Sequence, residues 1–386
     1  MAGPASKASV RGDLLIFGGA AFLVIVGLGW WLSRGDRAPI TSKGRSIRGD
    51  LRSMLVGDKA CAECHPGEAA LHARSGHART FKLAEESRLA SDLDGQSFPD
   101  PELPEVTWDY ALRDGRLQVE RREGETTETF TLEYALGSGG HATTFVSLVK
   151  GEEGAPLTGF EHHLTHFAHR DPPMGITPGQ DRPAPLPGTV AQGRHLRAAD
   201  VLVCFGCHTT LTSNEGKARI VPDQVLPNIS CESCHAPGRE HIDAIRSGAR
   251  KRASAIDFGP GREKADTELR FCGQCHRHPE MAPPGSIRPD NREITRFQPV
   301  GLMQARCYKE APGNLKCSKC HDPHAKASED TKSYERICVS CHSGAGKTSC
   351  QVSPREACVS CHMPKADAGQ GVLFTDHWIR RRKPIE

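Results

Sequence analysis

The chain has 386 residues, a formal net charge of +3, 37% hydrophobic and only 5% aromatic residues, with 39 glycines and 27 prolines. A charge so close to balance indicates no nucleic-acid partner, and this composition argues against an ordinary enzyme with a large side-chain core. Either part of the chain is disordered, or something other than side chains fills its interior.

The N-terminal segment contains an uncharged apolar run, Leu14–Leu32, which ends in Trp30 and Trp31. As a helix it would span about 29 Å, close to the hydrocarbon thickness of about 30 Å in a bilayer. The alternative is a cleaved signal peptide, which has a shorter apolar core and a small-x-small cleavage site. We expect an uncleaved single transmembrane helix within residues 1–33, followed by a linker over 34–57. Basic residues flank the run on both sides, so charge alone does not orient it.

Seven CxxCH units follow, and they use fourteen of the sixteen cysteines. In chain order, motifs 1 to 7 are Cys61-Cys64-His65, Cys204-Cys207-His208, Cys231-Cys234-His235, Cys272-Cys275-His276, Cys317-Cys320-His321, Cys338-Cys341-His342 and Cys358-Cys361-His362.

The spacing of this motif has a chemical reason. Zinc knuckles and thioredoxin-like redox pairs also use CxxC, but neither requires a histidine directly after the second cysteine. Two thiols three positions apart on a helical turn can add to the two vinyl groups of one haem, and the next imidazole then binds the iron. We therefore predict seven c-type haems, with the seven motif histidines as proximal iron ligands. The porphyrins would then form much of the apolar interior.

Haem c is attached outside the cytoplasmic membrane. We therefore expect a single-pass protein of the bacterial cytoplasmic membrane, with its C-terminal domain in the periplasm.

The first motif is followed by 138 residues without another. Pro66 is typical of a helix start, and residues 66–92 are predicted to form an amphipathic helix. Strands are predicted at VTWDYAL, RLQVERR and TETFTLEYAL, with a turn at Asp114-Gly115, and Ala142–Val149 favours another. Residues 150–200 are rich in proline and glycine and favour an ordered wrap with little regular structure.

The later motifs lie closer together, at intervals of 22, 36, 40, 16 and 15 residues. Short intervals place neighbouring haems close together, which favours electron hopping. We expect a first haem motif with a helix and a β-rich insertion over 58–203, and a six-haem array over 204–386. The fold class is predicted as mainly α with irregular loops, wrapped around a haem array, with a small β-rich insertion.

Twelve histidines lie outside the motifs, and seven irons need a sixth ligand. A single spare histidine is more often a surface or core residue, but seven open positions shift that expectation. His141 follows a Gly-rich turn that would let the backbone approach a flat cofactor. Our candidates for distal iron ligands are His77, His141, His166, His195, His241, His324 and His377.

The cluster of His162, His163, His166 and His169 allows several interpretations. It could supply one distal ligand, for which we select His166, or form a divalent-metal site or a proton relay beside an open haem. Four further side chains could also bind iron, namely His72, His278, Met174 and Met303.

Two cysteines lie outside the motifs. Cys307 and Cys350 could form a disulfide, remain free thiols or make an unusual haem contact. The basic tail Arg380–Lys383 is either a solvated segment or a docking site for lipid headgroups or an acidic partner.

Five segments, in order, resemble a bacterial multihaem cytochrome c family related to the cytochrome c552/c554 type. They are GSGGHATTF, ISCESCHAPGREH, QARCYKEAPGNLKCSKCHDPH, ACVSCHMP and TDHWIRRR. The resemblance covers roughly residues 58–384. It implies His77, His141, His241, His324 and His377 as iron ligands, and it makes Cys307 a family position. Family members often carry fused tetratricopeptide repeats, which this chain lacks, so any partner-binding role of those repeats does not carry over.

Two functions remain open. The first is an electron carrier with mostly bis-histidine haems, which passes electrons between a quinol-oxidising or other respiratory complex and a soluble acceptor. The second is an oxidoreductase of a small nitrogen or sulfur compound with one open haem, as in the hydroxylamine oxidoreductases and nitrite reductases of the wider superfamily. No acid, base or nucleophile constellation stands out, no CxxCK occurs, and no tyrosine lies in a recognisable motif. We therefore favour a carrier over an enzyme and predict no catalytic residue.

Overall fold

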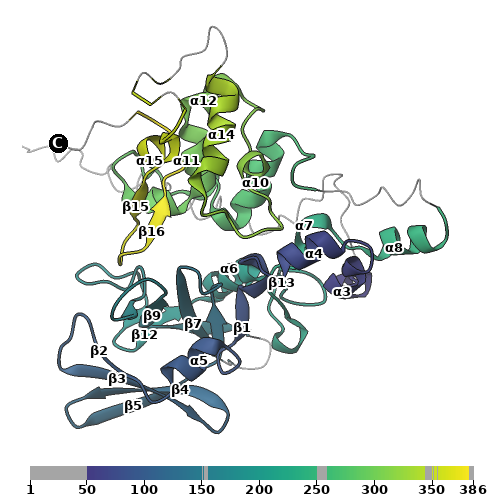
Figure 1. Ribbon diagram of the computed structural model, residues 1–386. Helices are drawn as coiled ribbons and strands as arrows, with labels where there is room; N and C mark the ends of the chain where they lie inside the picture. The colour runs from purple at the N-terminus through teal and green to yellow at the C-terminus, as the bar shows by residue number, and fades with distance from the viewer. Residues whose placement is uncertain are drawn as a thin grey trace, which may run out of the picture. The chain divides into compact units, whose positions relative to one another are not determined.

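The computed structural model describes residues 50–149, 151, 155–249, 259–343, 350, 352–353 and 355–381. Contacts divide the chain into Met1–Ser46 and Ile47–Glu386, and the described residues belong to the second unit (Figure 1). Of these residues 34% are helical and 23% lie in strands. The prediction of a mainly α fold with a small β-rich insertion is therefore wrong, because strands form two sizeable sheets.

The first of these is a four-stranded antiparallel sheet in the order β2-β3-β4-β5. Asp114 and Gly115 both have positive φ angles, 50° and 71°, which is typical of the tight turn predicted between two strands. Alternate residues such as Val106, Trp108 and Tyr110 are buried, so one face of the sheet packs into a core. The strands are β2 (Ser97–Pro99), β3 (Val106–Arg113), β4 (Arg116–Glu123) and β5 (Thr126–Leu132).

The second sheet has eight strands, with β1-β6-β7-β8-β12-β11 as its main path. Off this path, β9 pairs with β7 and β10 pairs with β9. Five of its strands, β8 to β12, lie in the segment 150–200. We expected little regular structure there, so that expectation was wrong. Its strands are β1 (Phe81–Leu83), β6 (Tyr134–Leu136), β7 (Ala142–Val149), β8 (Thr158–His162), β9 (Leu164–Phe167), β10 (Met174–Ile176), β11 (Thr189–Val190) and β12 (Gly193–Leu196).

The glycines of this segment serve close packing. A Cβ atom on Gly159 of β8 would lie 2.8 Å from Cγ2 of Val201, a residue of the neighbouring helix α6 (Ala198–His208). Gly193 of β12 has a φ of 145° and its backbone packs against the carbonyl of Glu161. Glycine-rich sequence here indicates close approach of strands.

The apolar core is concentrated in the β-rich part. Trp108, Tyr110, Phe145 and Leu164 belong to one buried cluster, and a second cluster includes Phe205 of α6. Among the described residues only eight apolar side chains beyond Leu211 are buried: Ala265, Leu269, Ile294, Pro299, Val300, Leu302, Ala305 and Ala368. As far as the structure describes it, the part of the chain with motifs 3 to 7 therefore has no large side-chain core of its own.

The segment before the sheets consists of short helices. The predicted helix over 66–92 is wrong in its length, because it ends at His72 and the chain continues into a β-strand at Phe81. Ser75 and Gly76 follow that end, and both have low helix propensity. The elements are α2 (Leu51–Met54), α3 (Asp58–Ala62), α4 (Pro66–His72), the 3₁₀ turn η1 (His77–Arg79) and, after β1, α5 (Arg88–Leu93).

The remainder is built from short helices and two small hairpins, β13 (Thr209–Leu211) with β14 (Leu226–Pro227) and β15 (Lys365–Asp367) with β16 (Leu373–Thr375). The helices are α7 (Cys231–His235), α8 (Arg239–Arg246), α10 (Ala265–His276), α11 (Gln298–Gln304), α12 (Arg306–Glu310), α13 (Cys317–Cys320), α14 (Thr331–His342) and α15 (Cys358–His362). The 3₁₀ turns are η2 (Pro222–Gln224), η3 (Pro279–Met281) and η4 (Arg292–Arg296).

The expectation of a single-pass membrane protein is corrected by the structure. In the part of the chain that it describes, no helix has the length and apolar character needed to cross a bilayer. The predicted span, Leu14–Leu32, lies outside the described residues.

Candidate functional site

The CxxCH motifs lie on helical turns, as their spacing predicts. Motifs 2, 4 and 6 form the last turns of α6, α10 and α14, and motifs 3 and 7 make up α7 and α15. In motif 1 the amide of His65 donates to the carbonyl of Cys61 at 2.9 Å, and His321 does the same to Cys317 in motif 5. Each motif therefore carries its two thiols one helical turn apart.

Four motif histidines lie opposite a histidine from a distant segment. Two imidazoles that bind one iron from opposite sides have ring centroids about 6 Å apart, because each metal–nitrogen bond is about 2 Å and each ring centre lies about 1 Å further out. The observed centroid distances match this value. The pairs are His65 and His241 (6.5 Å), His77 and His276 (6.1 Å), His235 and His324 (5.8 Å), and His321 and His377 (6.2 Å).

The residues present therefore fit haem c: paired thiols, an adjoining imidazole and, in four cases, a second imidazole at the spacing that an intervening iron requires. These pairs include four of the predicted distal ligands, and their assignment to iron stays a prediction.

Backbone carbonyls fix the tautomers of several of these rings. The Nδ1 atoms of His208, His362 and His377 lie 3.0, 3.0 and 2.9 Å from the carbonyl oxygens of Thr80, Arg380 and Thr375. A carbonyl only accepts, so each Nδ1 carries the proton and each Nε2 keeps a lone pair for a metal.

Burial keeps several of the rings neutral. It lowers the pKa of His208, His276 and His321, and it lowers the pKa of His377 to about 4. Burial also lowers the pKa of His77, against a hydrogen bond with the Pro323 backbone that raises it. A neutral imidazole is the form that binds a metal.

Motifs from different parts of the chain contact one another. The backbone N–H of Cys231 in motif 3 donates to Asp58 Oδ1, just before motif 1, at 3.0 Å. Ser233, between the cysteines of motif 3, hydrogen-bonds through Oγ to Thr210 Oγ1, two residues after motif 2, at 3.1 Å. Motif 2 contacts motif 4 in turn, since Cys207 Sγ lies 3.8 Å from the carbonyl oxygen of Gln274.

The series continues to the last motif. Ser318 of motif 5 donates its amide to Glu268 Oε1, in the helix that carries motif 4, at 2.7 Å. Helix α13 packs against α14. Helix α14 packs against α15 in turn (Figure 1). The seven motifs therefore form one unbroken series of neighbours in the order 1–3–2–4–5–6–7.

Two buried carboxylates hold this arrangement. Glu232 of motif 3 accepts backbone N–H groups from Val56, Gly57 and Gly238 at 2.8 to 3.1 Å. Glu268 is completely buried and accepts from the Gly261 amide and from the amide and hydroxyl of Ser318 at 2.7 to 2.8 Å. Each acid joins segments far apart in sequence, and the sequence carries no signal that would have identified either.

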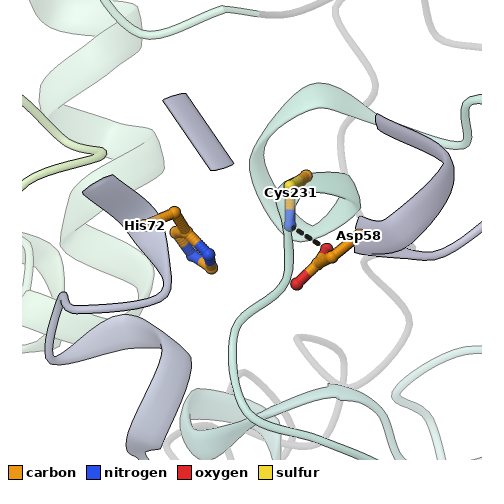
Figure 2. A group of neighbouring side chains, drawn as sticks. All are labelled: Asp58, His72 and Cys231. Carbon is orange, nitrogen blue, oxygen red and sulfur yellow. Dashed lines mark hydrogen bonds between the residues drawn. The ribbon is translucent and has the colours of Figure 1, made fainter. Parts of the chain in front are cut away.

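Asp58, His72 and Cys231 form a cluster in which one ligand atom of each lies within 4.8 Å of the others (Figure 2). Such a set could hold a divalent cation. Two observations favour a different reading. Cys231 is the first cysteine of motif 3, and the Asp58 carboxylate already accepts the N–H at the start of α7. The cluster is thus explained by the capping of a motif helix.

The cluster from His162 to His169 is largely built into the core. His162 is buried, and its Nε2 lies 2.7 Å from the Tyr110 hydroxyl, which donates because burial raises the pKa of Tyr110. Burial lowers the pKa of His162 to about 3, so this ring is neutral. His163 Nε2 lies 3.1 Å from Asp100 Oδ2. Burial raises the pKa of Asp100, but hydrogen bonds from His163, the Glu102 amide and Trp108 outweigh it and lower the pKa to about 2.

The other candidates lie elsewhere. The His141 ring lies 4.9 Å from that of Phe374. His166 is half-buried at the β9–β10 pairing, and the exposed His195 packs on Phe160 at 5.2 Å. The structure places none of these three opposite a motif histidine within the described residues. His278 is buried beside motif 4, where its Cβ packs against Gly273.

The two methionines and the two cysteines outside the motifs lie in different parts of the fold. Met174 belongs to the apolar core, whereas Met303 lies in α11. Cys307 and Cys350 are both free thiols, so the disulfide between them is not formed.

Three comparisons with known proteins bear on this site. The family described as "Cytochrome c554 and c-prime" matches residues 190–236, the segment that contains motifs 2 and 3. Among curated proteins there is no match. The chain is similar to the outer cell wall cytochrome OcwA, with 17% identity and a TM-score of 0.43, over 85% of this chain and 80% of that one.

Proposed function

We propose that this chain, whose motifs and matched segment are those of a multihaem c-type cytochrome, binds seven haems c and transfers electrons along them. The observation that carries the proposal is the unbroken series of contacts 1–3–2–4–5–6–7 between the motifs. When bound, haem c supplies a one-electron Fe(III)/Fe(II) couple. A chain in which every attachment motif touches the next suits transfer between neighbours.

In this proposal the motif cysteines hold each haem through thioethers, and the motif histidines are the proximal ligands. His241, His77, His324 and His377 are the distal ligands of motifs 1, 4, 3 and 5, which the centroid distances near 6 Å support. If both imidazoles of a pair held one iron, a substrate would find no free coordination position there. The partners are redox proteins: a respiratory complex that donates electrons and a soluble acceptor.

The alternative, an oxidoreductase with one open haem, loses some of its basis. Its polar site could have lain in the cluster from His162 to His169 or elsewhere in the 138-residue interval, but the rings of His162 and His163 make buried hydrogen bonds within the β-rich core. A carrier requires no acid, base or nucleophile beside its cofactors.

The test uses the full chain produced in a host that attaches haem c. We expect seven haems per chain by the pyridine haemochrome assay and only low-spin signals in the electron paramagnetic resonance spectrum of the oxidised protein. The Cys358→Ala/Cys361→Ala variant is the matched control and should carry six. A colourless protein with zinc bound would refute the proposal, and a high-spin fraction near one-seventh would favour the enzyme.

A further inference from the structure

Lys217 lies where three haem-attachment motifs meet. Its Nζ donates a hydrogen bond to the carbonyl oxygen of Gly206, between the two cysteines of motif 2, at 2.6 Å. Three motif cysteines lie close enough to act on its charge: Cys207, Cys234 and Cys275, from motifs 2, 3 and 4. The lysine is therefore placed beside three consecutive members of the series 1–3–2–4–5–6–7.

The described part of the chain offers this ammonium group no acidic partner. Within the described residues no carboxylate lies at ion-pairing distance from Lys217. The side chain is half-buried, and burial lowers the pKa of Lys217. Lys316, beside motif 5, differs because its Nζ lies 3.8 Å from the buried Glu268 carboxylate. An uncompensated, partly buried cation is costly, so its position beside the motifs calls for a reason.

We propose that Lys217 is an electrostatic positioning residue that raises the reduction potential of the haems held by motifs 2, 3 and 4. The proposal rests on the function proposed above. Reduction adds one electron to an iron, supplied by the donor protein or an electrode mediator, and a nearby positive charge stabilises the reduced form. Partial burial weakens screening by water and salt, so the effect reaches all three neighbours. The haems of motifs 3, 2 and 4 would then retain electrons more strongly than without this charge.

The test is a spectroelectrochemical titration of the full chain with its haems, for the wild type and three variants. Lys217→Gln removes the charge and keeps a donor for the Gly206 carbonyl, Lys217→Met removes both, and Lys217→Arg retains the charge. We expect three of the seven one-electron steps to move to lower potential in the Gln and Met variants. The other four steps should stay in place, and the Arg variant should overlay the wild type. The shift should persist at high ionic strength.

The inference is overturned if the neutral variants overlay the wild type, or if the Arg variant shifts as far as they do. It is also overturned if both neutral variants lose haem while the Arg variant keeps it, since the charge would then act in assembly. The haem content of the wild type decides the proposed function separately. A wild type without haem refutes that function, whereas a haem-loaded chain with unmoved potentials refutes this inference alone.

Discussion

Replacing Glu268 tests how firmly motifs 4 and 5 are held together. Its carboxylate, completely buried, accepts three hydrogen bonds, from Gly261 N, Ser318 N and Ser318 Oγ. Hydrogen bonds to a charged group each contribute about 1.5–3 kcal/mol, and buried donors left unsatisfied cost about 1–3 kcal/mol. Glu268→Gln keeps the shape but turns an amide NH₂ towards one of these donors, so we expect a loss of about 2 kcal/mol. Glu268→Ala removes every acceptor and should cost about 4 kcal/mol.

Hydrogen–deuterium exchange measures this loss locally. A loss of about 2 kcal/mol in the free energy of opening corresponds to roughly thirtyfold faster exchange, since each 1.4 kcal/mol is a factor of ten. The acceleration should be confined to peptides that cover Gly261 and Ser318. Glu125→Gln, the same change at an exposed turn between β4 and β5, is the control and should leave these peptides unchanged. Unaltered exchange in Glu268→Gln would show that the carboxylate does not couple the two motifs.

Three further predictions address ligation, acid stability and the free thiols. His77→Ala should convert one-seventh of the haem to a high-spin form in the electron paramagnetic resonance spectrum, whereas His195→Ala should not; an unchanged His77→Ala spectrum would contradict the pairing with His276. The pKa of His162 is about 3, against about 6.5 when unfolded, so stability should fall as the pH drops from 6.5 towards 3. His162→Gln should flatten that part of the unfolding free energy measured against pH, and an identical slope would refute the assignment. Thiol titration of the denatured haem-loaded protein should find two reactive thiols per chain, Cys307 and Cys350; more would mean that fewer than fourteen cysteines hold haem.

Local sequence signals predicted much of the fold near turns and motifs. The strands on either side of Asp114-Gly115 were correct because two residues with positive φ and alternating burial specify a hairpin locally. The strands between 150 and 200 were not predicted. They are two to five residues long, and their glycines permit close packing, which in sequence resembles a loop. The low aromatic content also contributed to the wrong fold class, because the few large side chains gather in one part of the chain and form a core there.

The candidate site divides in the same way. The motifs, and the prediction that their histidines are proximal ligands, follow from spacing alone. Which histidine faces which motif does not, because His241 lies opposite motif 1 and His324 opposite motif 3, although each follows a different motif in sequence. Glu268 and Lys217 carry no sequence signal, since their roles depend on contacts with other segments of the chain. His162 and His163 are the opposite case. Their clustering in the sequence suggested a functional site, but both side chains lie in the core.

The crossing of these segments has a consequence for how the protein matures. If the proposed ligation holds, a haem attached at motif 1 would gain its second imidazole only when His241 folds against it, and a haem at motif 5 only when His377, which follows the last motif, does so. Each such bond ties two remote stretches of chain, much as a late crosslink does. Proteolytic cleavage just after β15 would remove His377 but leave all seven attachment motifs. The protein would then keep its full colour, while the iron at motif 5 would lose its second imidazole.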